Sequence, residues 1–150
     1  MDRVAIWSPL ALGAGALAAT IVIHALAVAG TVKFARHQVR VRGSGAGFWS
    51  DVAIVAGAVG FALAAHLLEI GVWAVLLVAC GEFPAFAIAY YHSAVNYTTL
   101  GYGDIVMSES WRFLGPLEAT NGMLLFGVST ALVFAVIQRI AQAKFPDLKA

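Results

Sequence analysis

The chain has 150 residues, of which 61% are hydrophobic and only 11% carry a charge, and its mean hydropathy is +0.87. A water-soluble domain of this length would carry about twice that share of charged residues, so the composition indicates a protein embedded in a membrane. The net charge of +1 implies no nucleic-acid partner, and the single cysteine, Cys80, excludes an internal disulfide framework and a cysteine-rich metal site.

The first long apolar run covers residues 9–34. About 20 apolar residues cross a bilayer, so this run is long enough to span with some tilt. A basic stretch and the flexible turn "GSGAG" follow it. We therefore expect residues 1–47 to form an N-terminal transmembrane helix, packed at the periphery, and a basic cytoplasmic loop.

Two more apolar runs, residues 52–80 and 116–140, are also long enough to span. Between them, the apolar segment that starts at Pro84 is too short to cross, and it predicts a re-entrant helix over residues 84–98. The expected fold class is therefore an all-α membrane protein with three transmembrane helices and one re-entrant helix.

Charge asymmetry predicts the orientation. The positive-inside rule places the basic stretch 33–42 and the C-terminus in the cytoplasm, with the N-terminus and the re-entrant segment outside, in a protein of the plasma membrane. Seven of the nine basic residues lie on the cytoplasmic side, namely Lys33, Arg36, Arg40, Arg42, Arg139, Lys144 and Lys149.

The stretch "NYTTLGYGDI", residues 96–105, follows the predicted re-entrant helix. Non-helical backbone at membrane depth persists only where protein buries it or water lies beside it. Gly101 and Gly103 reach backbone angles closed to other residues. Their alternation with Leu100 and Tyr102 lets successive carbonyl oxygens point to one side, and the Thr99 hydroxyl adds a ligand at the inner end. Four such segments around an axis would replace the hydration shell of a cation.

The sequence "TTLGYGD" resembles the signature of the potassium channel family, whose commonest form is T-V-G-Y-G-D. That family also has the order outer helix, pore helix, filter and inner helix, which matches residues 52–80, 84–98, 99–103 and 116–140. The resemblance therefore implies a pore domain over residues 48–150. It implies K⁺ bound at Thr99, Leu100, Gly101 and Tyr102, no other cofactor, no enzymatic activity, and passive conduction by a homotetramer.

The same resemblance assigns roles on the predicted inner helix. Gly122 matches the hinge glycine of the family, and Gly127 is a second glycine five residues later. Thr130 falls where the family places a hydroxyl that faces the cavity. Phe134 and Gln138 lie four residues apart at the predicted bundle crossing, where Phe134 either gates by dewetting or packs against lipid or a neighbour.

Residues around the filter give a second set of expectations. By resemblance, Tyr91 donates a hydrogen bond to the filter aspartate, Asp104. Glu118, one turn before the hinge glycine, is expected behind the filter, either bonded to the pore helix or protonated. The chain departs from the family where Leu100 replaces valine and Met107 replaces a common proline. These departures bear on inactivation rather than on conduction.

Ionisable residues within spans are costly and point to function. His66 and Glu69 share a helix face, and His24 lies in the preceding antiparallel span. We expect either a pH-responsive cluster of these three residues or a hydrogen-bond network that ties helices together; a metal site would need more ligands. The sequence has no run of arginines at every third position, so we expect no voltage sensor. We also expect no soluble ligand-binding domain.

Three alternatives to a potassium channel remain at this point. The chain is also consistent with a weakly selective cation channel, with a non-conducting accessory subunit that keeps a vestigial filter, and with an intramembrane enzyme that uses His66 and Glu69. For either kind of channel, the expected partners are further copies of the chain and membrane lipid.

Overall fold

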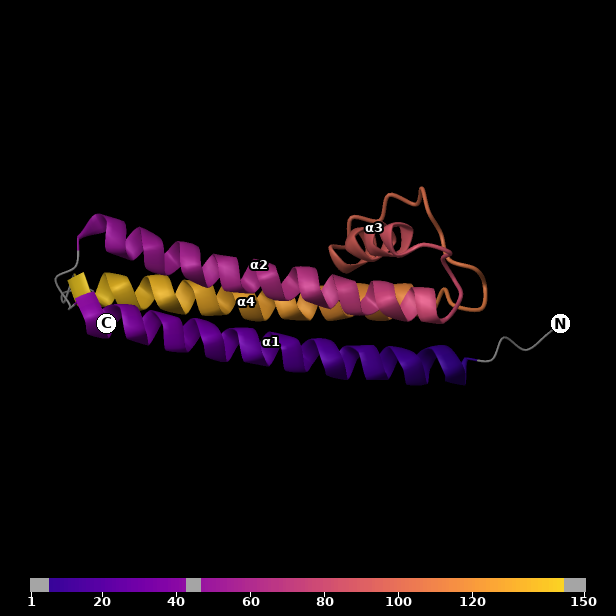
Figure 1. The fold of residues 1–150 in the computed structure, drawn as a ribbon, viewed down its shortest axis with the longest axis horizontal. Helices are drawn as coiled ribbons and strands as arrows, with labels where there is room; N and C mark the ends of the chain where they lie inside the picture. Colours follow the sequence, from indigo (N-terminus) through magenta and orange to yellow (C-terminus); the bar gives the residue numbers. More distant parts are fainter. Residues whose placement is uncertain (1–5, 43–46, 145–150) are drawn as a thin grey trace.

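The computed structural model describes residues 6–42 and 47–144, and the described chain is all-helical. Helices α1 (Trp7–Arg42), α2 (Phe48–Ala79) and α4 (Leu114–Lys144) are long and apolar enough to cross a membrane. They run side by side and contact one another pairwise (Figure 1). The short helix α3 (Phe86–Tyr97) completes the fold, so the predicted fold class is confirmed.

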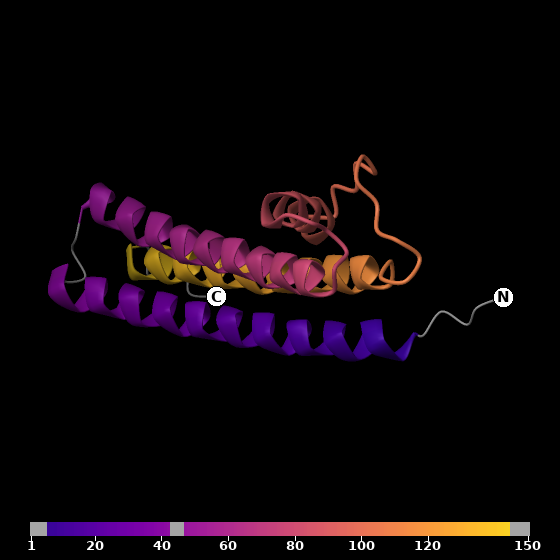
Figure 2. The same cartoon turned by 45° about the vertical axis from the view of Figure 1, so that its right-hand side comes forward.

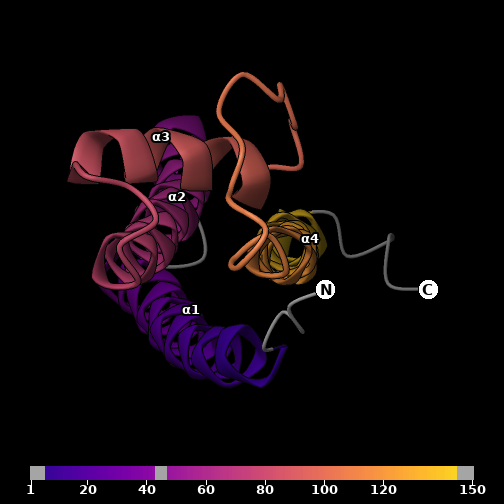
Figure 3. The same ribbon diagram turned by 90° about the vertical axis from the view of Figure 1, so that its right-hand side faces the viewer.

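Helix α3 lies on the side of α2 and α4 that faces away from α1, near the end of the bundle where α2 ends and α4 begins (Figures 2 and 3). It contacts α2 and α4. The loop from α3 to α4 rises on that same side (Figure 3). This arrangement holds a short helix and an irregular loop against one end of a three-helix bundle.

The helix ends differ from the predicted ones. Helix α1 continues through the basic stretch 33–42, which was predicted as a loop, because that stretch contains no proline or glycine and its lysine and arginine residues favour helices. Helix α2 begins at Phe48 rather than at residue 52. Helix α3 is shorter than the predicted 84–98. Residues 43–46 of the expected turn at 43–47 lie outside the described residues, as does the basic tail beyond Lys144.

Helix α4 also extends beyond its predicted bounds of 116–140. Pro116 falls in its first turn, where backbone N–H groups have no acceptor within the helix, so the missing N–H of proline costs no hydrogen bond. At the far end, the Lys144 ammonium pairs with the Asp51 carboxylate at the start of α2. The two helices are thus joined by charge at the end of the bundle opposite to α3.

The apolar core lies between α2, α3 and α4. Trp73 and Leu77 of α2, Tyr97 of α3 and Leu114 of α4 are all fully buried in it. Asn121 of α4 accepts a hydrogen bond from the Trp73 indole at 3.0 Å. These contacts place the end of α3 against both flanking spans.

A second polar contact brings α1 to the same point. The Thr20 hydroxyl of α1 lies 2.9 Å from Asn121 Oδ1, and Thr20 and Asn121 are both buried. Polar side chains that meet inside a membrane protein hold helices together, because lipid offers them no other partner. The first span is therefore joined to α4 by a buried polar contact, not by apolar packing alone.

At Gly122, α4 passes close to the backbone at the end of α3. A β-carbon at this position would lie 1.9 Å from the Tyr97 carbonyl oxygen and 2.9 Å from the Tyr97 carbonyl carbon. Backbone atoms cannot swing away as side-chain tips can. The hinge role that the resemblance implies for Gly122 stays a prediction; the structure adds a packing role, because only glycine fits here.

We expect Gly122→Ala to destabilise the protein by about 1–3 kcal/mol, the usual cost of overpacking. Gly127→Ala is the matched control on the same helix, because nothing lies within 4 Å of an added β-carbon. Its thermal midpoint should stay equal or rise, since alanine favours helices over glycine by up to about 1 kcal/mol. Thermal unfolding in detergent measures both variants; equal midpoints would contradict the packing role.

Candidate functional site

The segment after α3 combines irregular backbone with helix-like bonding. The φ angles of Thr99, Gly101 and Gly103 are +59°, +61° and +71°. Glycine reaches this region freely, whereas threonine meets a steric cost there, so Thr99 is held in place by its surroundings. The alternation of positive φ at every second residue gives residues 99–103 a repeating backbone geometry.

The amides of this segment bond to the end of α3. The Thr99 amide donates to the Asn96 carbonyl at 2.8 Å. The Leu100 and Gly101 amides both donate to the Val95 carbonyl, at 2.9 and 3.3 Å. The last turn of α3 therefore holds the start of the segment.

The carbonyl oxygens of residues 99–103 are different. In the described parts of the chain, no backbone or side-chain donor forms a hydrogen bond to any of them. The segment is also exposed in the single chain, with the Leu100 and Tyr102 residues 54% and 66% accessible. Five consecutive carbonyls are thus exposed and without a donor among the described residues.

Three contacts brace the backbone that follows. The Tyr91 hydroxyl of α3 donates to the Asp104 carboxylate at 2.7 Å, so the structure brings together the two residues that the resemblance paired. His92 Nδ1 lies 3.1 Å from the Ile105 carbonyl oxygen. Glu82, just after α2, accepts hydrogen bonds from the amide and hydroxyl of Ser108 at 2.5 and 2.7 Å. Sequence reasoning found the first contact but missed the other two.

The Tyr91 contact changes the ionisation of both partners. The hydrogen bond from Tyr91 is the main reason why the pKa of the Asp104 carboxyl lies below its ordinary value, and backbone amide bonds add to this. The same bond is the main cause of the raised pKa of the Tyr91 phenol. Because the pKa of Asp104 is depressed on folding, its stabilising effect is present above the ordinary pKa and is lost as the pH falls through the lowered one.

The residues predicted for the hinge, cavity and gate all lie on α4. Gly127, Thr130, Phe134 and Gln138 are exposed in the single chain, and the Thr130 hydroxyl donates to the Phe126 carbonyl of its own helix at 2.8 Å. Their roles stay predictions.

Glu118 is fully buried on α4, with Ser93 and Asn96 of α3 as polar neighbours. Neither carboxyl oxygen of Glu118 has a hydrogen-bond partner, and the Ser93 hydroxyl is likewise unpartnered. Ser93 and Asn96 nevertheless lie close enough to act on the carboxyl, so the expected bond to the pore helix stays a prediction. Glu118 does lie against α3, as its predicted place behind the filter requires.

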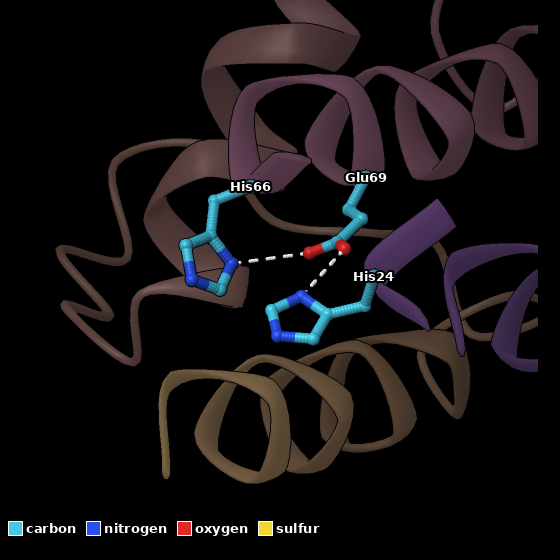
Figure 4. A group of neighbouring side chains, drawn as sticks. All are labelled: His24, His66 and Glu69. Carbon is cyan, nitrogen blue, oxygen red and sulfur yellow. Dashed lines mark hydrogen bonds and ion pairs between the residues drawn. The ribbon is translucent and has the colours of Figure 1, made fainter. Parts of the chain in front are cut away.

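The ionisable residues of the first two spans do come together. Figure 4 shows His24 of α1 pointing toward His66 and Glu69 of α2. His24 Nδ1 lies 2.9 Å from Glu69 Oε1, and His66 Nδ1 lies 3.1 Å from Glu69 Oε2. All three residues are buried. The side-chain cluster predicted from the spacing is present.

Two members of this cluster were missed by sequence reasoning. The Tyr97 hydroxyl of α3 donates to Glu69 Oε2 at 2.5 Å. The Ser129 hydroxyl of α4 lies 3.0 Å from His66 Nε2 and 3.3 Å from His24 Nε2. The hydroxyl of Ser129 within the apolar run of α4 was a signal that the sequence offered. The sequence did not show the register between helices, which decides what that hydroxyl contacts. We call these five residues, His24, His66, Glu69, Tyr97 and Ser129, the polar ring.

The polar ring needs no metal ion to satisfy its nitrogens. Donor atoms of His24, His66 and Glu69 lie within 4.8 Å of one another, which makes them the described residues that come nearest to a metal-ligand set. Each of the four imidazole nitrogens, however, already lies within hydrogen-bonding distance of an oxygen. The geometry is that of a closed hydrogen-bond network.

We expect Tyr91→Phe to raise the pKa of Asp104 toward its ordinary value of about 3.9, because the largest cause of the depression is removed. Tyr90→Phe is the control, since the Tyr90 hydroxyl donates to the Leu67 carbonyl instead. Carboxyl NMR of aspartate-labelled protein, with Asp104→Asn for assignment, follows the titration. An unchanged Asp104 pKa in Tyr91→Phe would show that this hydrogen bond is not what depresses it.

Comparison with known proteins gives one match. The family described as "Ion channel" matches residues 65–139, half of the chain, and this range contains α3, the segment 99–103 and most of α4. No curated protein and no solved structure matches. This match favours a channel over an enzyme. On this match, the chain belongs to the ion channel family.

Proposed function

We propose that the protein is a potassium-selective channel in which several copies of residues 99–103 form the filter. The observation that carries the proposal is the run of carbonyl oxygens without donors. Such oxygens replace the hydration shell of K⁺ when they are arranged in stacked rings. K⁺ is the bound and permeating ion, with ligands at Thr99, Leu100, Gly101 and Tyr102, and no other cofactor is required.

One chain supplies only one side of such a ring, so the proposal requires assembly. A homotetramer puts four carbonyls at each level. The exposed apolar side chains of α4 support assembly, because α4 is the least buried of the three spans and so leaves surface for neighbours and for a pore. These side chains are Met123, Leu124, Val128, Phe134 and Ile137.

The proposed orientation puts α3 and the filter at the outer face of the plasma membrane. Basic side chains of α1 and α4 gather around one pocket at the opposite end of the bundle, and these are Arg36, Arg40, Arg139 and Lys144. A cluster of arginine and lysine at one end of a bundle favours the cytoplasmic side for that end. The C-terminal end of α3, whose dipole is negative, then points into the membrane toward the permeating cation.

Potassium flux into liposomes containing purified protein tests conduction. We expect Gly101→Ala to abolish flux, because alanine at φ +61° costs about 1–2 kcal/mol in each of four subunits and distorts the carbonyl run. Gly60→Ala is the control, since an added β-carbon on α2 meets nothing within 4 Å. Absence of flux from the purified wild type would favour an accessory subunit instead.

Bilayer recordings test selectivity. With potassium on one side and sodium on the other, the reversal potential should be strongly displaced from zero, because the carbonyl ligands favour K⁺. A reversal potential near zero would indicate the weakly selective cation channel. Native mass spectrometry of the same preparation should show four copies, and a stable monomer or dimer would overturn the assembly.

A further inference from the structure

The polar ring is closed. Glu69 joins both imidazoles at their Nδ1 atoms, at 2.9 Å to His24 and 3.1 Å to His66. Ser129 joins the same two imidazoles at their Nε2 atoms, at 3.3 Å to His24 and 3.0 Å to His66. Tyr97 donates to Glu69 from α3. Residues of all four helices therefore share one hydrogen-bond circuit.

The protons of this circuit can be counted. The five residues make six contacts, and each contact needs a hydrogen between its two heavy atoms. His66 Nδ1 lies 3.1 Å from both Glu69 Oε2 and the Tyr97 hydroxyl, so one N–H of His66 serves two of these contacts and five hydrogens are needed in all. The hydroxyls of Tyr97 and Ser129 supply two hydrogens, and two neutral imidazoles supply one N–H each. The fifth hydrogen is missing unless the ring holds one more proton, and without it one contact of the circuit is left with lone pairs only.

The charge leads to the same count. With two neutral imidazoles and an ionised Glu69, the buried ring carries a net charge of −1. One added proton makes it neutral, as an imidazolium with a carboxylate or as two neutral imidazoles with a carboxylic acid. Both forms supply the five hydrogens that the six contacts need. A buried net charge is costly, so hydrogen bonding and electrostatics favour the same state.

No other charged group compensates the ring. The titratable groups that face the imidazoles are Glu69 from α2 and Tyr97 from α3, while α4 presents Ser129 and the Phe126 ring. Glu118 of α4 is a further carboxyl group that acts on Tyr97. Within the described chain, no lysine or arginine contacts the five residues.

We infer that the polar ring is a binding site for one proton, which locks α4 to α1 and α2. When the proton leaves, one contact of the circuit loses its hydrogen bond and the ring becomes anionic. Ser129 is the only member on α4, so the link to α4 depends on the two contacts made by its hydroxyl. Proton occupancy thus adds to or removes from the hold of the first two spans on α4, beside the contacts that Asn121 makes with Thr20 and Trp73.

The sign of the pH dependence follows from the proton count. Relative to neutral imidazoles and ionised Glu69, the folded ring holds one added proton. In the unfolded chain the two histidines hold two added protons at about pH 5 and none at about pH 8, with a midpoint near pH 6.5. The contribution of the ring to stability therefore rises up to about pH 6.5 and falls above it.

Glu69→Gln separates this inference from a merely structural network. An amide can donate to one Nδ1 and accept from the other, so all contacts are filled with neutral imidazoles and no added proton. Between about pH 6.5 and 8.5, the unfolding equilibrium constant of the wild type should rise by up to about tenfold per pH unit, whereas that of Glu69→Gln should not rise. Parallel profiles of the two proteins over this range would overturn the inference.

His37→Gln is the control for histidine content, because His37 is exposed on α1 and takes no part in the ring. Its pH profile should match the wild type. If Glu69→Gln does not fold, NMR of wild-type protein labelled at histidine nitrogen and glutamate carboxyl decides the matter. At about pH 8 one imidazolium or one carboxylic acid should remain; only neutral histidines and ionised glutamates would overturn the inference.

None of these measurements depends on conduction, so the proton site and the proposed channel can fail separately. If both hold, flux of the wild type should change only at the more alkaline pH at which the folded ring loses its proton, and Glu69→Gln should show no such change, because α4 carries the proposed gate.

Discussion

A polar group of the backbone at the depth of the hydrocarbon core has to find a partner, because no lipid group replaces a missing one. Helices α1, α2 and α4 meet this requirement internally. The segment 99–103 meets only half of it, since its first amides bond to the end of α3 while its carbonyls find no donor in the described chain. The fold around it, from the Tyr91 brace to the Gly122 contact, keeps this backbone in place. A dehydrated cation shared between copies is the proposed partner.

Tyr97 joins the proposed filter to the rest of the bundle. Its hydroxyl belongs to the polar ring, its carbonyl rests against Gly122, and Thr99 follows two residues later. Tyr97 therefore contacts both the polar ring and α4, two residues before the proposed filter begins. Thr20 and His24 extend this connection to α1, which was expected to be only peripheral.

Much of the architecture was predictable because the length of an apolar run decides whether a helix spans. The helix ends could not be predicted in this way, because helices such as α1 continue past the apolar run into the basic sequence that follows. His66 and Glu69 could be paired from spacing within one helix, and His24 from antiparallel depth. Ser129 and Tyr97 could not, because contacts between helices depend on rotation and register that no single run encodes. The Tyr91–Asp104 bond came from resemblance alone.

The contribution of α1 to the buried polar contacts bears on modularity. A two-span pore unit transplanted without residues 1–47 would lose the imidazole of His24 and the hydroxyl of Thr20 together, leaving Glu69 and Asn121 each one neighbour short inside the bilayer. Any shortened version of this protein would need apolar replacements for both Glu69 and Asn121. The leading span is an integral part of the scaffold rather than a detachable accessory.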